Sequence, residues 1–462
     1  MEHCNGFIAG SKFRLKRREA FLLLIVLLNT SGIRAQQAVS NSGVQSFTLK
    51  DCIEYALQNQ PGLKQTIINT SITKATNAIN LSGWLPQIGA SVGFVHYTQQ
   101  PTSFITNPSD PSGPQVAIKS GVINTFIPAI TANQAIFSPS LLYAATSAKL
   151  NLKASKQVTD STKIFIVAAV SKSFYNLLLT LKEIDVLKED TVRLAKNLKD
   201  AYNQYKGGIV DQTDYNEAAI SLNNSIAQLR QANESIIPQY AGLKQLMGYP
   251  PQNQFNVNYD TVQMLSDVLL DTTEQLNYER RIEYQQLATV RAIQHKLTNY
   301  YWVTLAPSLG VYYDYNYEYE NNHLPSLFST AYPNSLVGVS LTLPIFTGFS
   351  RLESVHRSKL QEKILELSEV NLKSEIYTEY TQAMASYRSN LFTLNLLRDN
   401  VAMAKKTYDV VNLQYRQGIV PYLNVITAES NLISSEIGYI NSLFQVLSSK
   451  IDVQKAMGNI PY

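Results

Sequence analysis

The stretch YKGGIVDQTDYNEA, residues 205–218, returns in altered form as YRQGIVPYLNVITA at residues 415–428. Both copies place a tyrosine three residues before a glycine, follow that glycine with Ile-Val, and end on alanine. A period of about 210 residues is far too long for a solenoid repeat, so we interpret it as duplication of a whole unit. Further landmarks recur in the same order, namely Leu85-Pro86 with Ala306-Pro307, Ile136-Phe137 with Ile345-Phe346, and Met247-Gly248 with Met457-Gly458.

A long stretch without proline or glycine precedes each copy. The two stretches are residues 141–205 and 351–417. Apolar residues recur there every three or four positions, as at Val170, Phe174 and Leu177, which is the spacing of one helix face. A helix of about 60 residues is ~90 Å long at 1.5 Å per residue. Helices of that length are typical of coiled coils.

The glycine in each copy predicts the end of a long helix, because glycine adopts the left-handed conformation without steric cost. Gly208 and Gly418 occupy this place. Asp211 is suited to cap the next helix, Asp214 lies in its first turn where the helix dipole favours an anion, and Pro421 is tolerated at a first helical position. We therefore expect two helical hairpins. On this interpretation these residues serve the fold alone.

Segments between the long helices show the two-residue period of half-buried strands. In GVYYDYNYEYE, residues 310–320, tyrosines and polar side chains alternate between the two faces. About 9–11 residues suffice to cross a bilayer at a tilt, although surface hairpins show the same pattern. Residues 337–343 alternate as a partner strand, and residues 88–97 and 122–136 take the same place in the first half. One face carries Tyr313, Tyr315, Tyr317 and Tyr319, and the other carries Asp314, Asn316, Glu318 and Glu320.

These four strands are too few to close a membrane barrel, and an open sheet edge cannot face lipid. If the strands span a membrane, the protein must therefore oligomerise. Three protomers would supply twelve strands, and the count by itself leaves two or four protomers open. The tyrosine face would either meet lipid or line the pore. Tyrosine is enriched at membrane interfaces, which favours lipid and puts the acidic residues in water.

The first 35 residues have the order of a secretory signal peptide, with five cations at positions 12–18 ahead of an apolar run at residues 20–28. Cleavage after Ala35 would remove 6 of the 39 Lys+Arg and 2 of the 35 Asp+Glu, which leaves 33 of each. A mature chain near neutrality gives no electrostatic support for nucleic-acid binding. Cys52 would be its single cysteine and cannot form an internal disulfide.

The turn from Tyr415 to Ala428 resembles the helical-hairpin motif of TolC-type outer-membrane efflux proteins, Tyr-Arg-x-Gly-x-x-Ser-x-x-Asp-Val-Leu-x-Ala. The first copy, from Tyr205 to Ala218, is similar to the same motif. Leu85-Pro86 before the first strand and Leu343-Pro344 after the last look like further landmarks of that family. The resemblance covers roughly residues 47–460.

The resemblance implies a mainly α protein with a β-barrel contribution, assembled as a homotrimer in the outer membrane. Twelve strands would form a pore, and twelve long helices a tube through the periplasm. The far end of the tube would meet a periplasmic adaptor (membrane fusion) protein and an inner-membrane pump of the RND or ABC type. The chain would conduct small molecules or other cargo passively, in contact with outer-membrane lipid and without any cofactor.

The expected organisation is a signal peptide at residues 1–35, a first repeat at 36–250, a connecting segment at 251–270 and a second repeat at 271–462. Each repeat would contain a helix of some 30 residues, two strands and a long helical hairpin.

By the same resemblance, the hairpin tips form the adaptor-docking surface, and three polar residues beside them serve a periplasmic gate or cap the helices. Asp211 and Pro421 stand where the motif has serine, and Asn424 stands where it has aspartate. An acidic ring at the tip would therefore be half-populated. The docking residues are Gly208, Ile209, Val210, Gly418, Ile419 and Val420, and the gate or cap residues are Asp211, Asp214 and Asn424.

The sequence has no His-Glu-x-x-His run and no phosphate-binding Gly-Lys-Ser/Thr loop. Adjacent acids such as Glu189-Asp190 lie in helix-patterned sequence, and we interpret them as solvated. We therefore expect no catalytic site, no metal site and no enzyme. Two alternatives stay open. One is a coiled-coil interaction protein whose hairpins never enter a membrane, and the other is a secreted enzyme on a helical scaffold.

Overall fold

The computed structural model describes residues 45–106, 112–258, 264, 266–271 and 273–462. The chain divides into two units, residues 1–45 and 46–462, and the second contains the long helices and the sheet. The expected signal peptide at residues 1–35 lies outside the described residues, as does part of the expected connecting segment at 251–270.

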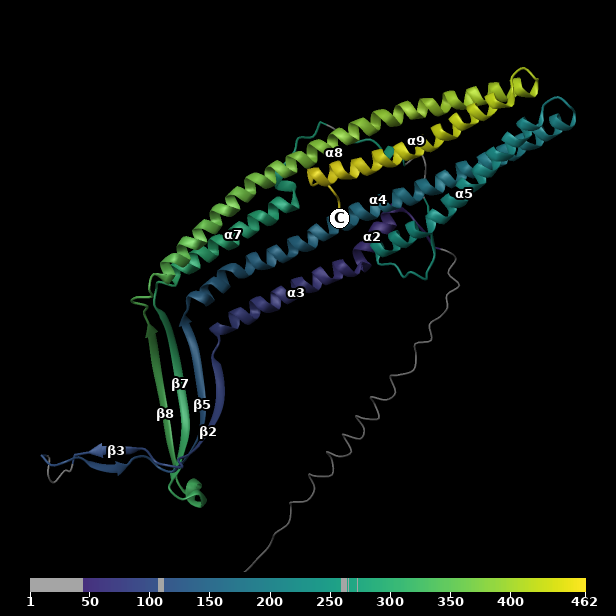
Figure 1. Ribbon diagram of the computed structural model, residues 1–462. Helices are drawn as coiled ribbons and strands as arrows, with labels where there is room; N and C mark the ends of the chain where they lie inside the picture. Colours follow the sequence, from purple (N-terminus) through teal and green to yellow (C-terminus); the bar gives the residue numbers. More distant parts are fainter. Residues whose placement is uncertain (1–44, 107–111, 259–263, 265, 272) are drawn as a thin grey trace, which may run out of the picture. The chain divides into compact units, whose positions relative to one another are not determined.

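The first half contains two strands that enter a common sheet and one long helical hairpin (Figure 1). Its helices are α2 (Leu49–Asn59), α3 (Pro61–Leu81), α4 (Pro139–Lys206) and α5 (Gln212–Met247), with the 3-10 helix η1 (Ser82–Trp84). Its strands are β1 (Gln45–Phe47), β2 (Gln87–His96), β3 (Thr102–Ile105), β4 (Val116–Lys119) and β5 (Asn124–Phe137).

The second half repeats this order after β6 (Phe255–Val257). α4 and α8 contain 68 and 67 residues, which confirms the two long helices that the missing prolines and glycines predict. The helices are η2 (Tyr278–Arg280), α7 (Ile282–Val303), η3 (Leu324–Ser329), α8 (Ser350–Arg416) and α9 (Tyr422–Met457), and the strands are β7 (Ser308–Asn321) and β8 (Ala331–Thr342).

The 30-residue helix expected at the start of the first half is divided into α2 and α3. The break falls at Gln60, whose extended backbone suits the residue before a proline. Gln60 Oε1 accepts a hydrogen bond from the Leu63 N–H (2.7 Å), and Pro61 occupies the first helical position, where its missing N–H is harmless. The sequence already contains this signal, since Pro61 interrupts the helical pattern.

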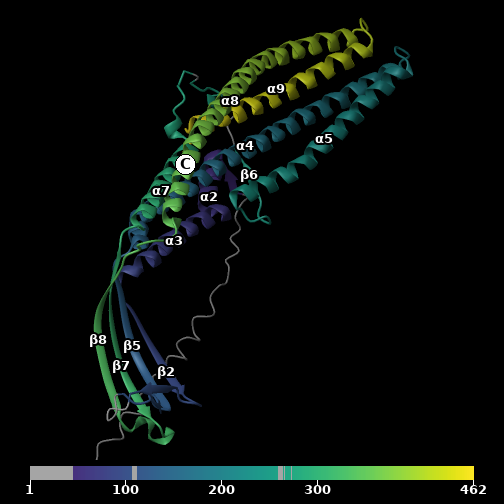
Figure 2. The same cartoon turned by 60° about the vertical axis from the view of Figure 1, so that its left-hand side comes forward.

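The four long strands form one antiparallel sheet in the order β2-β5-β7-β8, with β2 and β8 at its edges (Figure 2). All four predicted strand segments are therefore confirmed. A separate two-stranded ribbon, β3-β4, lies in the connection between β2 and β5 and has no counterpart among the predicted elements.

The helices form pairs that continue from the strands. α3 lies along α4, and α7 lies along α8, while α4 also contacts α7 and α9 (Figures 1 and 2). Beyond these pairs, α4 turns into α5 and α8 turns into α9, which gives the two hairpins that the repeated glycines predict. Both hairpin turns therefore lie at the ends of α4 and α8 that are remote from the sheet.

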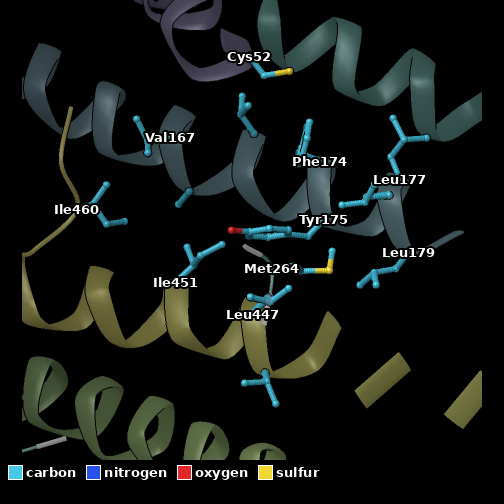
Figure 3. Packing of buried hydrophobic residues seen from close by; sticks show 14 of the residues in the cluster. Cys52, Val167, Phe174, Tyr175, Leu177, Leu179, Met264, Leu447, Ile451 and Ile460 are labelled. Carbon is cyan, nitrogen blue, oxygen red and sulfur yellow. The ribbon is translucent and has the colours of Figure 1, made fainter. Parts of the chain in front are cut away.

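The main hydrophobic core surrounds the middle of α4. Cys52 of α2, Phe174 of α4 and Leu447 of α9 all point into it (Figure 3). α4 is the one helix, among the residues the structure describes, that is long and apolar enough to cross a membrane. Half of the apolar stretch of α4 is buried inside the protein, so the packing of α4 against other helices accounts for its apolar composition.

Candidate functional site

The first hairpin turn presents one isoleucine to solvent. Gly208 has φ +69°, and the Ile209 N–H donates to Gln204 O (2.9 Å), which closes the end of α4. Ile209 is 71% exposed, whereas Val210 is half-buried. Asp211 caps α5 by accepting from the Thr213 N–H (2.7 Å), and hydrogen bonds from Thr213 hold the Asp211 pKa below its usual range.

The second turn has the same backbone geometry without the acidic cap. Gly418 has φ +71°, the Ile419 N–H donates to Gln414 O (2.9 Å), and Ile419 is 69% exposed. Pro421 was expected at the first helical position, but it is the N-cap residue, and α9 begins at Tyr422. The reason is the extended backbone of Pro421, with ψ 159°. Val420 is half-buried against the neighbouring apolar side chains.

The three expected gate residues do not form one cluster. Asp211 and Asn424 are exposed on different hairpins. Asp214 is half-buried, and its pKa is raised by burial and by the nearby Asp211 and Glu217 carboxylates. Its negative charge also contributes to the raised pKa of the Tyr415 phenol in the other hairpin, so Asp214 lies where the two hairpins meet.

Tyrosines fill the space between the hairpins beside the turns. The rings of Tyr415 and Tyr422 lie 5.2 Å apart, and both are buried against Ala201 and Ala218 of the first hairpin. Burial raises the Tyr415 pKa to about 12 and raises that of Tyr422 as well. Neither hydroxyl has a hydrogen-bond partner among the residues described. Both tyrosines belong to the repeated turn, yet the sequence gives no sign that they are buried.

A buried group of charged and polar side chains joins the hairpins further along α4. Arg193 donates to Asp190 on its own helix (2.7 Å) and to Glu429 on α9 (2.9 Å). Asp190 also accepts from the Ser225 hydroxyl of α5 (2.7 Å). We call this group the inter-hairpin cluster, and its members are Asp190, Arg193, Asn197, Ser225, Tyr408 and Glu429.

The prediction that Glu189 and Asp190 are both solvated is wrong for Asp190. Glu189 is exposed, but Asp190 is fully buried. Successive residues of a helix are rotated by about 100°, so one of the two faces water while the other meets α5 and α9. Which one is buried depends on Ser225 and Glu429, which lie 35 residues or more away in sequence. No local pattern marks this cluster.

The strand register separates two faces of the sheet. Tyr315 lies opposite Ile130 and Ser335, and its hydroxyl donates to the Tyr317 hydroxyl (2.8 Å). Asp314 lies opposite Thr131 and points to the other face. The face with the tyrosines is mostly apolar and also carries Ile88, Val92, Phe94, Phe126, Ser335, Val337, Val339 and Leu341. The opposite face is more polar and carries Ser91, Thr125, Asn133, Asn316, Glu318, Asn334 and Ser340, together with Val95, Tyr312, Tyr332 and Leu336.

One short match to a catalytic motif proves to be structural. Residues 89–93 read Gly-Ala-Ser-Val-Gly, which fits the Gly-x-Ser-x-Gly pattern of hydrolases. That motif needs its serine on a sharp strand-to-helix turn. Ser91 instead lies in the middle of β2, paired with Ala129 of β5. The described residues contain no group of three or more potential metal ligands.

Comparison with known proteins agrees with this architecture. The family model for outer membrane efflux proteins matches residues 52–249 and 303–459, one segment in each half. The chain belongs to the outer membrane efflux protein family. This confirms the resemblance drawn from the turn motif, and it places the chain in the outer membrane. The outer membrane efflux protein family is not an enzyme family.

Relatives of known role share modest identity with this family member. The probable efflux pump outer membrane protein TtgC and the antibiotic efflux pump outer membrane protein ArpC, both of Pseudomonas putida, are each 22% identical over 321 residues. Each match covers 66% of this chain and 62% of the relative. The chain therefore matches somewhat less than two thirds of the length of these relatives.

Solved structures share the fold across nearly the whole chain. The outer membrane protein VceC of Vibrio cholerae has a TM-score of 0.69 at 15% identity, covering 89% of this chain and 96% of VceC. The CmeC outer membrane channel of Campylobacter jejuni has a TM-score of 0.70 at 18% identity, covering 93% of this chain and 91% of CmeC. The arrangement of long helices and strands is therefore the fold of these two proteins.

Proposed function

We propose that this chain is the channel subunit of a tripartite efflux or secretion system, and that its homotrimer conducts cargo passively. The sheet carries this proposal. Within the described residues, β2 and β8 are edges without a second partner strand. Because all neighbouring strands are antiparallel, β8 of one copy is correctly oriented to pair with β2 of the next. Three copies supply twelve strands, enough for a closed membrane barrel without exposed edges.

The two faces of the sheet support a barrel that faces lipid outside and water inside. Tyr313, Tyr315, Tyr317 and Tyr319 share their face with aliphatic and aromatic side chains, so we assign this aromatic face to lipid. The acidic residues on the other face would then line the water-filled pore. Outside the membrane, the long helices would continue that pore as a periplasmic tube.

Arginine substitutions on the two faces test this assignment. Val337→Arg places a charge on the aromatic face and should destabilise the membrane barrel by about 2–4 kcal/mol near the bilayer centre. Ser340→Arg places the same side chain on the other face and should leave trimers intact while changing ion selectivity in planar bilayers. Heat-modifiable trimers on gels and single-channel currents give the two measurements. Wild-type trimers without any conductance would contradict the channel, and tolerance of Val337→Arg would contradict the orientation.

The exposed isoleucines at the turns support an adaptor-docking role for the hairpin tips. We assign docking to Gly208, Ile209 and Val210 on the first tip, and to Gly418, Ile419 and Val420 on the second. A Cβ at either glycine meets no atom within 4 Å, but φ is positive there, so a bulky residue alters the tip shape and leaves the core intact. Replacing both glycines with leucine should abolish efflux and preserve trimers. Efflux that survives in intact trimers would exclude docking at the tips.

Photo-crosslinking in cells identifies the partner directly. A crosslinker at position 209 or 419 should capture a periplasmic adaptor protein, which in turn binds an inner-membrane pump of the RND or ABC type. The same crosslinker at Val192, which is 72% exposed on α4, is the matched control and should capture no adaptor. Asp211, Asp214 and Asn424 would cap or gate the tube beside this contact, and the chain itself would catalyse no reaction.

A further inference from the structure

The inter-hairpin cluster connects all four helices of the two hairpins. α4 contributes Asp190, Arg193 and Asn197, while Ser225 comes from α5, Tyr408 from α8 and Glu429 from α9. The Asn197 amide donates to the Glu429 carboxylate (3.2 Å) and to the Tyr408 hydroxyl (3.3 Å). Any movement of one hairpin against the other therefore has to break bonds made by α4 to Glu429 or Tyr408.

The charges of the cluster do not balance when both acids are ionised. Asp190 and Glu429 share one cation, the Arg193 guanidinium. Asp190 is 0% exposed and Glu429 2% exposed, so water screens the excess negative charge less than it would at the surface. An uncompensated buried charge is costly, and a buried carboxyl group can avoid that cost by binding a proton. When one of the two carboxylates binds a proton, the remaining carboxylate is balanced by the Arg193 guanidinium.

Glu429 is the acid that takes this proton. Burial raises its pKa to about 7, and the nearby Asp190 charge adds to the effect, while Arg193 and Asn197 oppose it. Tyr408 on α8 and Tyr422 on α9 also face Glu429, and both phenols have raised pKa values and stay neutral. Further along α9, burial raises the pKa of Glu436, which interacts with Arg193 and Asp190 of the cluster and with Lys405 of α8. α5 contributes only uncharged side chains to the cavity of about 390 Å³ beside the cluster, namely Ser221, Asn224, Ser225 and Gln228.

We propose that Glu429 is a proton-dependent clamp between the two hairpins. The protonated carboxyl group holds α9 against α4, and the ionised carboxylate favours separation of the hairpins. If the hairpins enclose the periplasmic end of a conducting tube, as the proposed function holds, the clamp makes acid favour the closed tube and alkali favour opening.

The direction follows from proton linkage. The pKa of Glu429 is about 7 when buried and has the ordinary value 4.5 when solvated. A group whose pKa is raised in one state stabilises that state when it is protonated. The stabilisation is complete at pH values below the lower pKa, and it is lost as the pH rises through the higher pKa. Between pH 5.5 and 8.5 these two values shift the equilibrium roughly 30-fold toward separated hairpins. This pH range includes neutral pH.

Spin-label distances measure the clamp independently of conduction. Labels on Asn216→Cys of α5 and Gln417→Cys at the second turn, both exposed positions, report the separation of the hairpins in the purified protein with Cys52→Ala and with Cys4 removed or replaced by alanine. We expect one short distance at pH 5.5, and a growing long-distance population as pH rises through about 7. Equal distance distributions at pH 5.5 and 8.5 would overturn the proposal even if the trimers conduct ions.

Three substitutions separate proton binding from simple packing. Glu429→Gln mimics the protonated acid and should keep the short distance at every pH. Asp190→Asn removes the competing charge and should move the midpoint to lower pH. Glu189→Gln, on the exposed neighbour of Asp190, is the matched control and should titrate like the wild type. A pH response that persists in Glu429→Gln, or an unmoved midpoint in Asp190→Asn, would assign the effect to another group and overturn the clamp.

Discussion

α5 and α9 occupy corresponding places in the repeat and have the same length of 36 residues, but they are packed differently. In α9, 15 residues are buried, whereas in α5 only 5 are. α9 contacts its own partner α8 and also α4 and α5 of the other hairpin, while α5 packs mainly on α4. Duplication thus produced two hairpins whose returning helices have the same length. Only α9, the returning helix of the second hairpin, packs between the two hairpins.

The amino acids of the two helices agree with this difference. α5 tolerates Pro238 in its interior, at an exposed position where the carbonyl group left without its helical N–H partner is accessible to solvent. α9 contains no proline and carries Glu429, the acid that reaches across to Arg193. A change in α9 therefore affects both hairpins, and a change on the outer face of α5 affects only one.

The largest contrast is expected at a pair of equivalent positions, Leu447 in α9 and Ile237 in α5. Leu447 is 1% exposed in the main core, and Ile237 is 62% exposed. Leu447→Ala should lower the free energy of unfolding by about 2–5 kcal/mol, as large-to-small substitutions in cores do. Ile237→Ala should change it by about 0.5 kcal/mol or less, like most surface substitutions. Denaturant unfolding in detergent measures both, and equal losses would refute the unequal packing of α5 and α9.

A second pair should behave alike, because here the halves remain equivalent. Gly248 and Gly458 end α5 and α9 with φ +68° and +72°. A Cβ would lie 2.8 Å from Asn59 O at Gly248 and 2.7 Å from Arg280 O at Gly458. Alanine at either site should therefore cost more than the ~1–2 kcal/mol of left-handed strain alone. Gly208→Ala, with open space around the Cβ, is the control for strain without a clash. The melting temperatures of the three variants measure these losses of stability.

The sequence predicts the elements of this fold well, because their signals are local. The absence of proline and glycine fixes the extent of α4 and α8, and the alternation of tyrosines with acids fixes β7. The packing of helix faces is not local. The burial of Asp190 depends on Glu429, some 240 positions away in sequence, and a rotation of about 100° around the helix axis decides between Asp190 and Glu189. The two hairpin turns can be predicted because glycine turns are local, whereas the inter-hairpin cluster has no local signal.

The smallest contrast is expected at the two N-caps. Asp211→Ala removes the acceptor for the Thr213 N–H, whereas Pro421 makes no side-chain cap bond, so Pro421→Ala removes nothing comparable. At pH 7, Asp211→Ala should speed hydrogen exchange of the first-turn amides of α5, and Pro421→Ala should leave those of α9 nearly unchanged.

The pH dependence of this contrast has a defined sign. The Asp211 pKa is lowered by Thr213, so the cap stabilises α5 fully above the ordinary value of 3.8 and loses its effect as pH falls through the lowered one. The protection that wild-type α5 has over Asp211→Ala should therefore disappear in acid, whereas the Glu429 clamp becomes tighter there. A first turn of α5 that is equally protected in both proteins at pH 7 would show that the acidic cap does not distinguish the two hairpins.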